Sequence, residues 1–180
     1  CKTATDAGII VVAAAGNGNT NLDGDDYAEY NGRENSGAII VGAGSNTTAH
    51  SKMSFSTYGS RVDIQAWGTK VVTTGYGYLA EYDGDKNQRY TDIFDGTSSA
   101  SACVAGAAVL LQSYAKNQLG TLFSPEEMRD LLKTYSHPQG GDDGNIGPAI
   151  ALDLVGQELV NRMVQMEFSR KGSPGVLLRF

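Results

Sequence analysis

The amino-acid sequence predicts an α/β fold with a largely parallel sheet flanked by helices, because buried strands alternate with helical segments along the chain. Residues 9–15 and 38–41 are short, continuous apolar runs, which is the pattern of parallel strands covered on both faces. Residues 98–119 have the length and composition of a helix. In such folds the carboxyl ends of the strands carry function, and the sequence places Asn17 and the loop before Ser98 at this edge.

The first half of the chain contains short elements joined by polar segments. Residues 1–8 are predicted to be the last turns of a helix that ends at glycine, and residues 19–36 an acidic surface loop. Residues 62–66 and 70–74 are predicted to be short strands. Residues 75–91 are rich in glycine, tyrosine and aspartate, which predicts a long loop that covers a functional region.

The second half is predicted to be mainly helical. The Ser-Pro-Glu-Glu motif that begins at Ser124 combines a capping serine, a proline at the first helical position and acidic residues in the first turn. It predicts a helix that ends near Tyr135 and turns three apolar side chains inward, those of Met128, Leu131 and Leu132. A further helix is predicted over residues 152–164.

The C-terminal tail is predicted to be distinct from the rest of the chain. Residues 1–163 are expected to form one domain, and residues 164–180 a tail. Within this tail, residues 164–168 and 176–180 are predicted to pair as a β-hairpin, because a Gly- and Pro-containing turn separates them.

Composition excludes several classes of protein. Hydrophobic residues make up 41% and charged residues 19% of the chain, which are globular values, and no apolar run is long enough to span a membrane. A net charge of −6 with scattered basic residues argues against nucleic-acid binding. Cys1 and Cys103 cannot form a disulfide framework, and Cys103, on the apolar helix, is interpreted as a small buried hydrophobe.

Ser98 has the surroundings that a nucleophile requires. The segment 96–98, Gly-Thr-Ser, continues directly into a helix of small and apolar residues. Ser98 is therefore predicted at a helix N-terminus, where unpaired backbone N–H groups and the helix dipole favour developing negative charge. Its own N–H would be one donor to an oxyanion in acyl transfer. On its own, however, such a serine is also what a helix cap requires.

Asn17 is the candidate for a second oxyanion donor. It follows a predicted buried strand, so its side-chain amide can be held rigidly and aimed. Asparagine also tolerates a turn with positive φ, which is the alternative explanation. The two motifs together, on an α/β pattern, favour the catalytic interpretation.

The sequence resembles the subtilisin-like serine peptidases over about residues 6–159. The resemblance lies in five segments: 13–17, 37–44, 54–59, 62–68 and 96–106. It implies the second half of a subtilisin-like catalytic domain, and thus an incomplete sheet. By this resemblance Ser98 is the nucleophile and Asn17 the oxyanion residue. Gly16 and the region 32–36, beginning at Gly32, are expected to line part of the substrate pocket.

The resemblance implies a secreted serine endopeptidase that hydrolyses polypeptides through an acyl-enzyme on Ser98. The aspartate and histidine motifs of the family precede the asparagine in chain order, and neither occurs in this sequence. They are expected from the N-terminal portion of the same peptidase domain. His50 and His137 are expected to be surface residues, so the chain alone is expected to be inactive. No cofactor is required.

Two features fit the resemblance less well. Ala102 and Cys103 stand where the family usually has proline followed by histidine or another residue, although proline is not chemically required there. By the resemblance, calcium is expected only as a structural ion, to which the acidic residues could offer oxygen ligands. They do not have the spacing of an EF-hand loop and are more typical of solvated turns. These residues are Asp23, Asp25, Asp26, Asp83, Asp85, Asp142 and Asp143.

Two other functional hypotheses remain open. The first is a catalytically inactive pseudopeptidase or binding module with the same fold. The second is a nucleotide-binding domain, since Gly16-Asn17-Gly18 follows a strand; that pattern is partial, and neither an opening helix nor a suitable acidic residue follows it. The incomplete domain is also expected to expose a strand edge and core surface, which promotes association.

Overall fold

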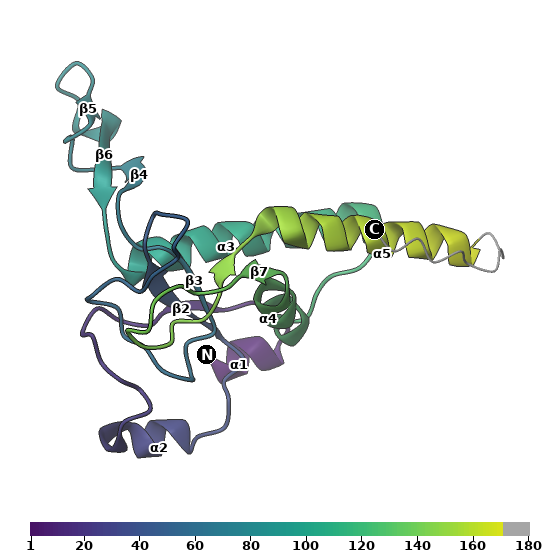
Figure 1. The fold of residues 1–180 in the computed structure, drawn as a ribbon. Helices are drawn as coiled ribbons and strands as arrows, with labels where there is room; N and C mark the ends of the chain where they lie inside the picture. Colours follow the sequence, from purple (N-terminus) through teal and green to yellow (C-terminus); the bar gives the residue numbers. More distant parts are fainter. Residues whose placement is uncertain (171–180) are drawn as a thin grey trace.

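A computed structural model describes residues 1–170 of the chain. Its centre is a five-stranded sheet in the order β1-β2-β3-β8-β7 (Figure 1). Neighbouring strands are parallel except for β7, which runs antiparallel to β8. The strands are β1 (Val12–Ala14), β2 (Ile39–Gly44), β3 (Ile64–Trp67), β7 (Ser136–His137) and β8 (Ala149–Ile150). This arrangement confirms the predicted fold class.

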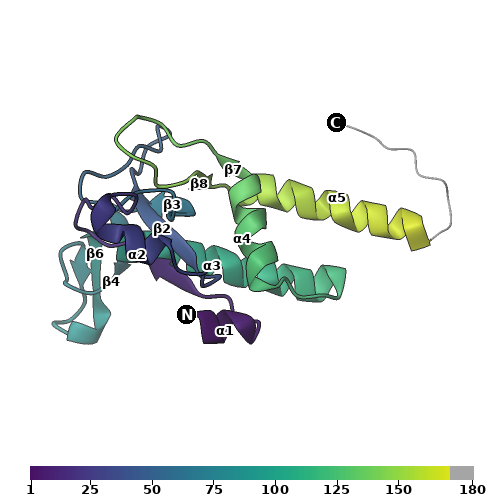
Figure 2. The same ribbon diagram turned by 90° about the horizontal axis from the view of Figure 1, so that it is seen from below.

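Helices pack on this sheet, and one of them extends well beyond it (Figure 2). The described helices are α1 (Lys2–Asp6), α2 (Ala28–Asn31), α3 (Thr97–Tyr114), α4 (Pro125–Thr134) and α5 (Leu152–Arg170). A π-helical turn, Ala115–Leu119, continues α3, and 3-10 turns lie at Asp25–Tyr27 and Lys86–Gln88. Because α3 contacts β1, β2 and β3, it crosses the sheet and ties its strands together.

The hydrophobic core lies between the sheet and the helices α3, α4 and α5. Its fully buried side chains are Ile39, Val41, Ile64, Val104, Met128, Leu132, Val155 and Leu159. The predicted inward positions of α4 are correct, since Met128, Leu131 and Leu132 are all buried. The prediction that the long apolar helix ends at residue 119 also agrees with the structure, where Gly120 adopts the left-handed conformation that ends it.

Strand β1 is less buried than the sequence suggested. Of the predicted strand over residues 9–15, only Val12–Ala14 is regular, and Ala14 is exposed. The reason is its place in the sheet: β1 pairs with β2 and is the edge strand of the described sheet. Ile9, just before it, is 58% exposed. An apolar run of this kind is typical of a strand with neighbours on both sides.

Two segments predicted as loops contain regular structure. Residues 19–36 include α2 and a 3-10 turn. Residues 71–94 form a three-stranded antiparallel sheet in the order β4-β6-β5, here called the arm, which projects from the body of the molecule (Figure 1). Its strands are β4 (Val71–Thr74), β5 (Ala80–Glu81) and β6 (Arg89–Phe94). The sequence pattern predicted β4 but not β6, whose β-branched and aromatic residues are interrupted by charges.

The predicted C-terminal hairpin is wrong in its first strand. Residues 164–168 continue α5, which runs to Arg170, while residues 176–180 lie outside the described part of the chain. The helix is already formed upstream, with an ion pair of 2.7 Å between Arg162 Nε and Glu158 Oε1 one turn apart. Since adding a residue to an existing helix is favourable and no glycine or proline intervenes, the helix propagates.

The start of α4 supports a prediction about stability. Glu127 N donates to Ser124 Oγ at 3.2 Å, and Ser124 N donates to Glu127 Oε2 at 2.8 Å, a reciprocal capping box. These hydrogen bonds lower the pKa of Glu127. Ser124→Ala is expected to reduce the free energy of unfolding by about 1 kcal/mol at neutral pH.

The pH dependence of unfolding tests the other half of the capping box, the hydrogen bond from Ser124 N to the Glu127 carboxylate. Because the folded-state pKa of Glu127 is lowered, its contribution is present above the unfolded pKa and is lost as pH falls through the folded value. Glu127→Gln keeps an oxygen for Ser124 N but has no charge, so thermal unfolding of wild type and Glu127→Gln should differ most at neutral pH and converge in acid. Ser113→Ala, at an exposed position of α3, is the matched control. A constant difference at all pH values would contradict the assignment.

Candidate active site

Ser98 lies at the N-terminus of α3, as the sequence predicted. The helix begins at Thr97, and Ser98 is exposed between two buried neighbours, Thr97 and Ser99. Gly96 precedes the helix with φ of 115°, a conformation that L side chains rarely adopt. The Ser98 amide donates to no other residue in the described part of the chain, so it is free to meet an acceptor from outside.

A hydrogen-bond network connects this helix start to the end of β1. Thr97 donates to Asn17 Oδ1 twice, from its backbone N and from Oγ1, each at 2.9 Å. Thr97 Oγ1 in turn accepts from Gly16 N at 3.1 Å. Thr97 is fully buried, whereas Asn17 is exposed. The carbonyl side of the Asn17 amide is therefore anchored inside the protein.

This anchoring decides which way the amide of Asn17 points. Because Oδ1 accepts both hydrogen bonds from Thr97, Nδ2 must be the other end, and within residues 1–170 it has no hydrogen-bond partner. The φ at residue 96 favours glycine, and a Cβ there would also lie in close contact with Asn17 Nδ2, at 3.2 Å. The result is a free, oriented N–H donor beside the Ser98 turn.

Thr97 is a residue of the candidate site that the sequence analysis did not identify. The signal was present, since Thr97 stands between the glycine and serine of the motif, but only the serine was assigned a role from the sequence. What the sequence could not reveal is that this hydroxyl reaches a residue 80 positions away in the chain.

Further contacts fix the turn before α3. Gly96 N donates to Gly68 O at 2.9 Å, and Lys70 N donates to Asp95 Oδ1 at 2.8 Å. On the other side, Ser99 Oγ donates to Trp67 O at 3.1 Å. The turn before α3 is thus held on both flanks by the end of β3 and the segment that follows it.

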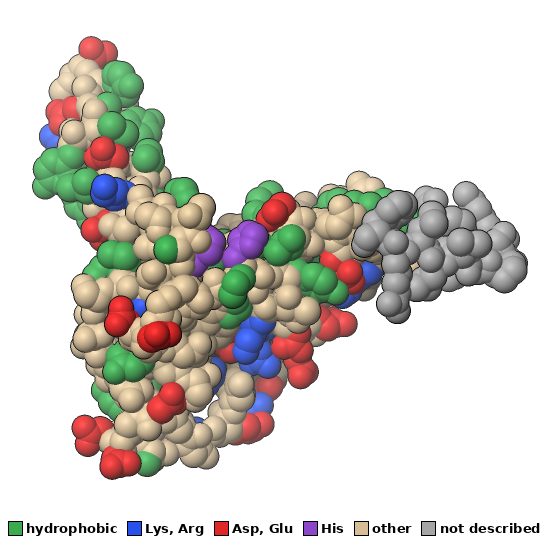
Figure 3. Space-filling model, viewed as in Figure 1, with side chains coloured by type: hydrophobic (Ala, Val, Ile, Leu, Met, Phe, Trp, Pro, Cys, Tyr) green, Lys and Arg blue, Asp and Glu red, His purple; other side chains and the backbone are tan. Residues whose placement is uncertain are grey.

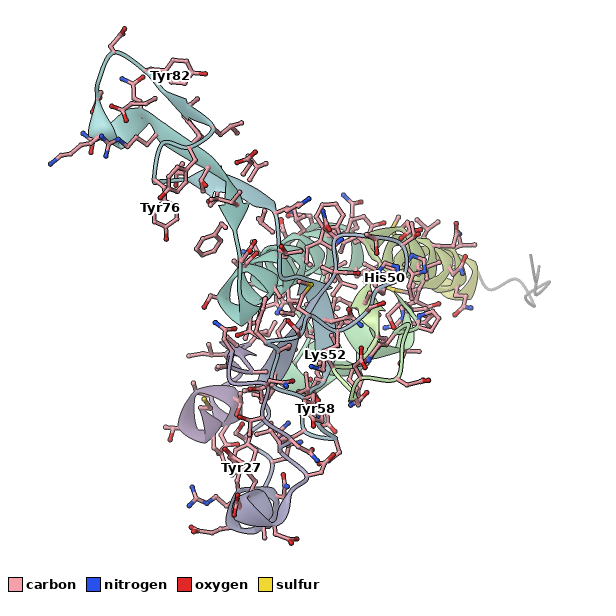
Figure 4. All side chains as sticks on the ribbon, turned by 60° about the vertical axis from the view of Figure 1, so that its left-hand side comes forward. Tyr27, His50, Lys52, Tyr58, Tyr76 and Tyr82 are labelled. Atoms are coloured by element: carbon pink, nitrogen blue, oxygen red, sulfur yellow. The ribbon has the colours of Figure 1, made fainter. Side chains whose placement is uncertain are left out.

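The loop after Asn17 is also fixed, by the side chain of Lys52 (Figure 4). Lys52 Nζ donates to Asn19 Oδ1 at 2.8 Å and stands 5.0 Å from the centre of the Tyr58 ring. The backbone of Asn19 is also held, since its N–H donates to Phe55 O at 2.8 Å. These contacts restrain the chain on the far side of the candidate donor.

A cavity of about 340 Å³ lies beside β1 and α2. It is lined by Ala14, Ala15, Leu22, Tyr27, Tyr30 and Ile40. Gly16 follows its lining residues directly, with φ of 106° and its N–H held by Thr97. Gly32 follows α2 and is exposed, two residues beyond the lining Tyr30. The substrate-binding roles of Gly16 and Gly32 stay predictions.

The two histidines lie together, but not at Ser98. The rings of His50 and His137 stack with centroids 5.5 Å apart and planes 3° from parallel, and the two side chains are neighbours on the surface (Figure 3). His50 also lines a second cavity, of about 280 Å³, together with Trp67 and Cys103. Burial raises the pKa of the Cys103 thiol, which suits a packing role. Within residues 1–170, neither imidazole forms a hydrogen bond to Ser98.

Other site types receive no support in the described residues. No group of three or more His, Cys, Asp or Glu side chains there could hold a metal ion, and structural calcium stays a prediction. Of the helices in residues 1–170, none has the length and apolar character needed to cross a membrane.

The network around Asn17 yields a prediction about Thr97. In the complete peptidase that the resemblance implies, Thr97→Val keeps the side-chain shape but removes the hydroxyl that holds Asn17 Oδ1 and Gly16 N. Losing one neutral hydrogen bond is worth about 1 kcal/mol, so kcat is expected to fall about fivefold to tenfold. Thr97→Ser keeps the hydroxyl and should retain most of the activity. Equal losses in both variants would assign Thr97 a packing role instead.

Comparison with known proteins identifies the family of the chain. The sequence profile of the Subtilase family matches residues 1–162. Over 148 residues the chain is 30% identical to an extracellular protease of Xanthomonas campestris pv. campestris, covering 82% of this chain and 23% of that protein. It is 35% identical over 147 residues to an alkaline proteinase of Hapsidospora chrysogena, covering 81% and 32%. The chain thus spans about a quarter to a third of these relatives.

Solved structures agree as well. A cold-adapted subtilisin-like serine proteinase is 26% identical with a TM-score of 0.56, covering 82% of this chain and 46% of that one. A lanthipeptide protease, at 20% identity, shares the fold with a TM-score of 0.65, covering 87% and 52%. With the profile match over residues 1–162, these likenesses show that the chain belongs to the subtilase family.

Proposed function

We propose that the complete protein is a secreted serine endopeptidase in which Ser98 is the nucleophile and Asn17 an oxyanion donor. The observation that carries the proposal is the anchored amide of Asn17, whose free Nδ2 stands beside the start of α3. Relatives named as extracellular proteases support both the chemistry and the localisation.

The proposed reaction is acyl transfer in two steps. Ser98 Oγ attacks the carbonyl carbon of the scissile peptide bond while its proton passes to an imidazole, and the carbonyl oxygen becomes an oxyanion. The free N–H of Ser98 and the Nδ2 of Asn17 donate to this oxygen, aided by the dipole of α3. The amine leaves with the proton from the imidazole, and water then hydrolyses the acyl-enzyme by the same route.

The imidazole and its aspartate partner are proposed to come from an upstream segment of the same domain. Two surfaces fit such a segment: the open edge of β1, and the apolar outer face of α3, where Val109 and Leu110 are 68% and 62% exposed. Leu111, one residue further, is buried, so α3 is apolar on both sides. A helix of this composition is typical of a position inside a domain.

The cavity beside β1 is proposed to receive a substrate side chain. Its lining residues Ala14 and Ala15 directly precede Gly16 and Asn17, and Leu22, Tyr27 and Tyr30 make its walls apolar. A large apolar side chain next to the scissile bond is therefore the favoured substrate feature.

A fluorophosphonate probe tests the proposal. Incubated with the complete domain, the probe should form an adduct that peptide mapping places on Ser98, because labelling requires an activated serine. This chain without the upstream segment should label far more slowly. A correctly folded complete domain that does not label would instead support the alternative, a catalytically inactive pseudopeptidase or binding module.

A further inference from the structure

The arm has one covered face and one bare face. Along β4 and β6, the side chains of Val71, Thr73, Thr91 and Phe94 are partly or fully buried. Those between them are exposed, as alternation along a strand requires. Thr91 is fully buried, so the covered face is a real packing surface.

The bare face is apolar with one acidic group. Val72 is 64%, Ile93 54% and Tyr90 39% exposed. The pairs Val71–Phe94 and Thr73–Thr91 leave two residues of β6, Asp92 and Ile93, opposite Val72 alone. This β-bulge turns both side chains outward. Asp92 forms no ion pair with any residue in the described part of the chain.

Exposed tyrosines lie along the rest of the arm, and one of them, Tyr82, meets the bare face at Tyr90. The Tyr82 ring meets the Tyr90 ring edge-on at 6.2 Å, and Tyr76 stacks with Tyr78 at 5.9 Å. Tyr82 and Tyr76 project from opposite sides of the arm (Figure 4). Exposed apolar and aromatic side chains gathered in this way mark an interaction surface (Figure 3).

The bare face begins at the candidate active site. Strand β6 ends at Phe94, and only Asp95 and Gly96 separate it from α3. The hydrogen bond from Lys70 N to Asp95 Oδ1 joins the two ends of the arm at this point. Six residues of strand extend about 20 Å, so the face extends outward from Ser98 over that order of length.

The outer edge of the arm is also open. In the described part of the chain, β4 pairs with β6 on one side and with no strand on the other. Unpaired backbone groups of an edge strand bind another extended chain through main-chain hydrogen bonds.

We infer that the bare face of the arm, Val72, Tyr90, Asp92 and Ile93, binds an extended stretch of the polypeptide substrate that continues from the scissile bond. The inference rests on the proposed function, which brings a polypeptide to Ser98. Apolar substrate side chains pack on Val72, Ile93 and Tyr90. A lysine or arginine of the substrate pairs with Asp92, which no residue of the described chain neutralises.

Comparing a long with a short peptide substrate distinguishes substrate binding by the arm from catalysis at Ser98. The variant is Val72→Ser with Ile93→Ser in the complete domain, and the control is Leu122→Ser with Val160→Ser, exposed positions outside the arm. The long substrate is an extended peptide of about twenty residues with alternating apolar and lysine side chains, enough to follow the arm. The short substrate is a chromogenic peptide of about four residues. The arm variant should lose about tenfold in kcat/KM on the long peptide, and the short peptide should be unaffected.

A binding measurement keeps the inference independent of turnover. In a Ser98→Ala background, fluorescence anisotropy of the labelled long peptide should show Kd about tenfold higher for the arm variant than for the control. Asp92→Asn should weaken binding of the lysine peptide at low salt and leave a glutamine-substituted peptide unchanged.

Each opposite result overturns the inference. Equal losses on the long and short peptides would show that the arm acts on the site rather than on the substrate. An unchanged Kd together with a lower Tm would show that another part of the protein covers the bare face. If no peptide is cleaved and Ser98 does not label, the proposed function fails, while the anisotropy result still decides whether the arm binds polypeptide.

Discussion

Ser98→Ala is expected to reduce kcat of the complete peptidase by about a millionfold, the magnitude known for the equivalent change in subtilisin. The physical reason is that alanine leaves no oxygen to form the acyl-enzyme, so only the oxyanion donors and substrate binding remain. Ser98 is exposed and its side chain holds no structural hydrogen bond within residues 1–170, so folding should be unaffected.

The measurement is peptide hydrolysis together with thermal unfolding. Ser113→Ala, an exposed serine on the same helix, is the control and should match the wild type in both. Ser99→Ala offers a second comparison, since Ser99 is buried and donates to Trp67 O. A Ser98→Ala protein that still cleaves peptides would show that the nucleophile is another residue.

Asn17→Ala is expected to lower kcat by about 100- to 1000-fold with little change in KM, again by the magnitude measured in subtilisin. Its Nδ2 meets the oxygen only when that oxygen becomes charged, so the loss falls on the transition state. Steady-state kinetics of the complete domain provide the test.

Asn17→Asp separates the donor from its anchor. The aspartate keeps an oxygen for the two hydrogen bonds from Thr97 but has no N–H to donate, and it adds negative charge beside the oxyanion. Its kcat should be at least as low as that of Asn17→Ala, with Tm nearer to the wild type. An active Asn17→Asp enzyme would mean that Asn17 serves only to hold the turn.

The fold was predictable where local signals agreed with burial. Continuous apolar residues marked β2, and the Ser-Pro-Glu-Glu motif marked the start of α4, because cap chemistry is written in adjacent residues. The strand predicted over residues 164–168 was wrong, since five residues that alternate between apolar and polar fit a strand or the continuation of a helix equally well. The arm was missed because pairing between β4 and β6 is decided by neighbours across the sheet.

The candidate site was predictable in its residues but not in its connections. Ser98 and Asn17 stood out because each lies at the end of a recognisable element. The hydrogen bonds through Thr97, and the orientation they impose on Asn17, depend on contacts between distant parts of the chain. Local patterns carry no information on such contacts.

The buried hydroxyl of Thr97 determines when the amide of Asn17, the candidate oxyanion donor, takes up its orientation. The dipole of the Asn17 amide is turned outward as the chain folds, before any substrate or base arrives. In water, solvent dipoles would have to rotate as charge develops on the carbonyl oxygen, and that rotation is part of the barrier. The hydrogen bonds from Thr97 already hold the Asn17 amide in the folded chain, so no such rotation is needed at this donor.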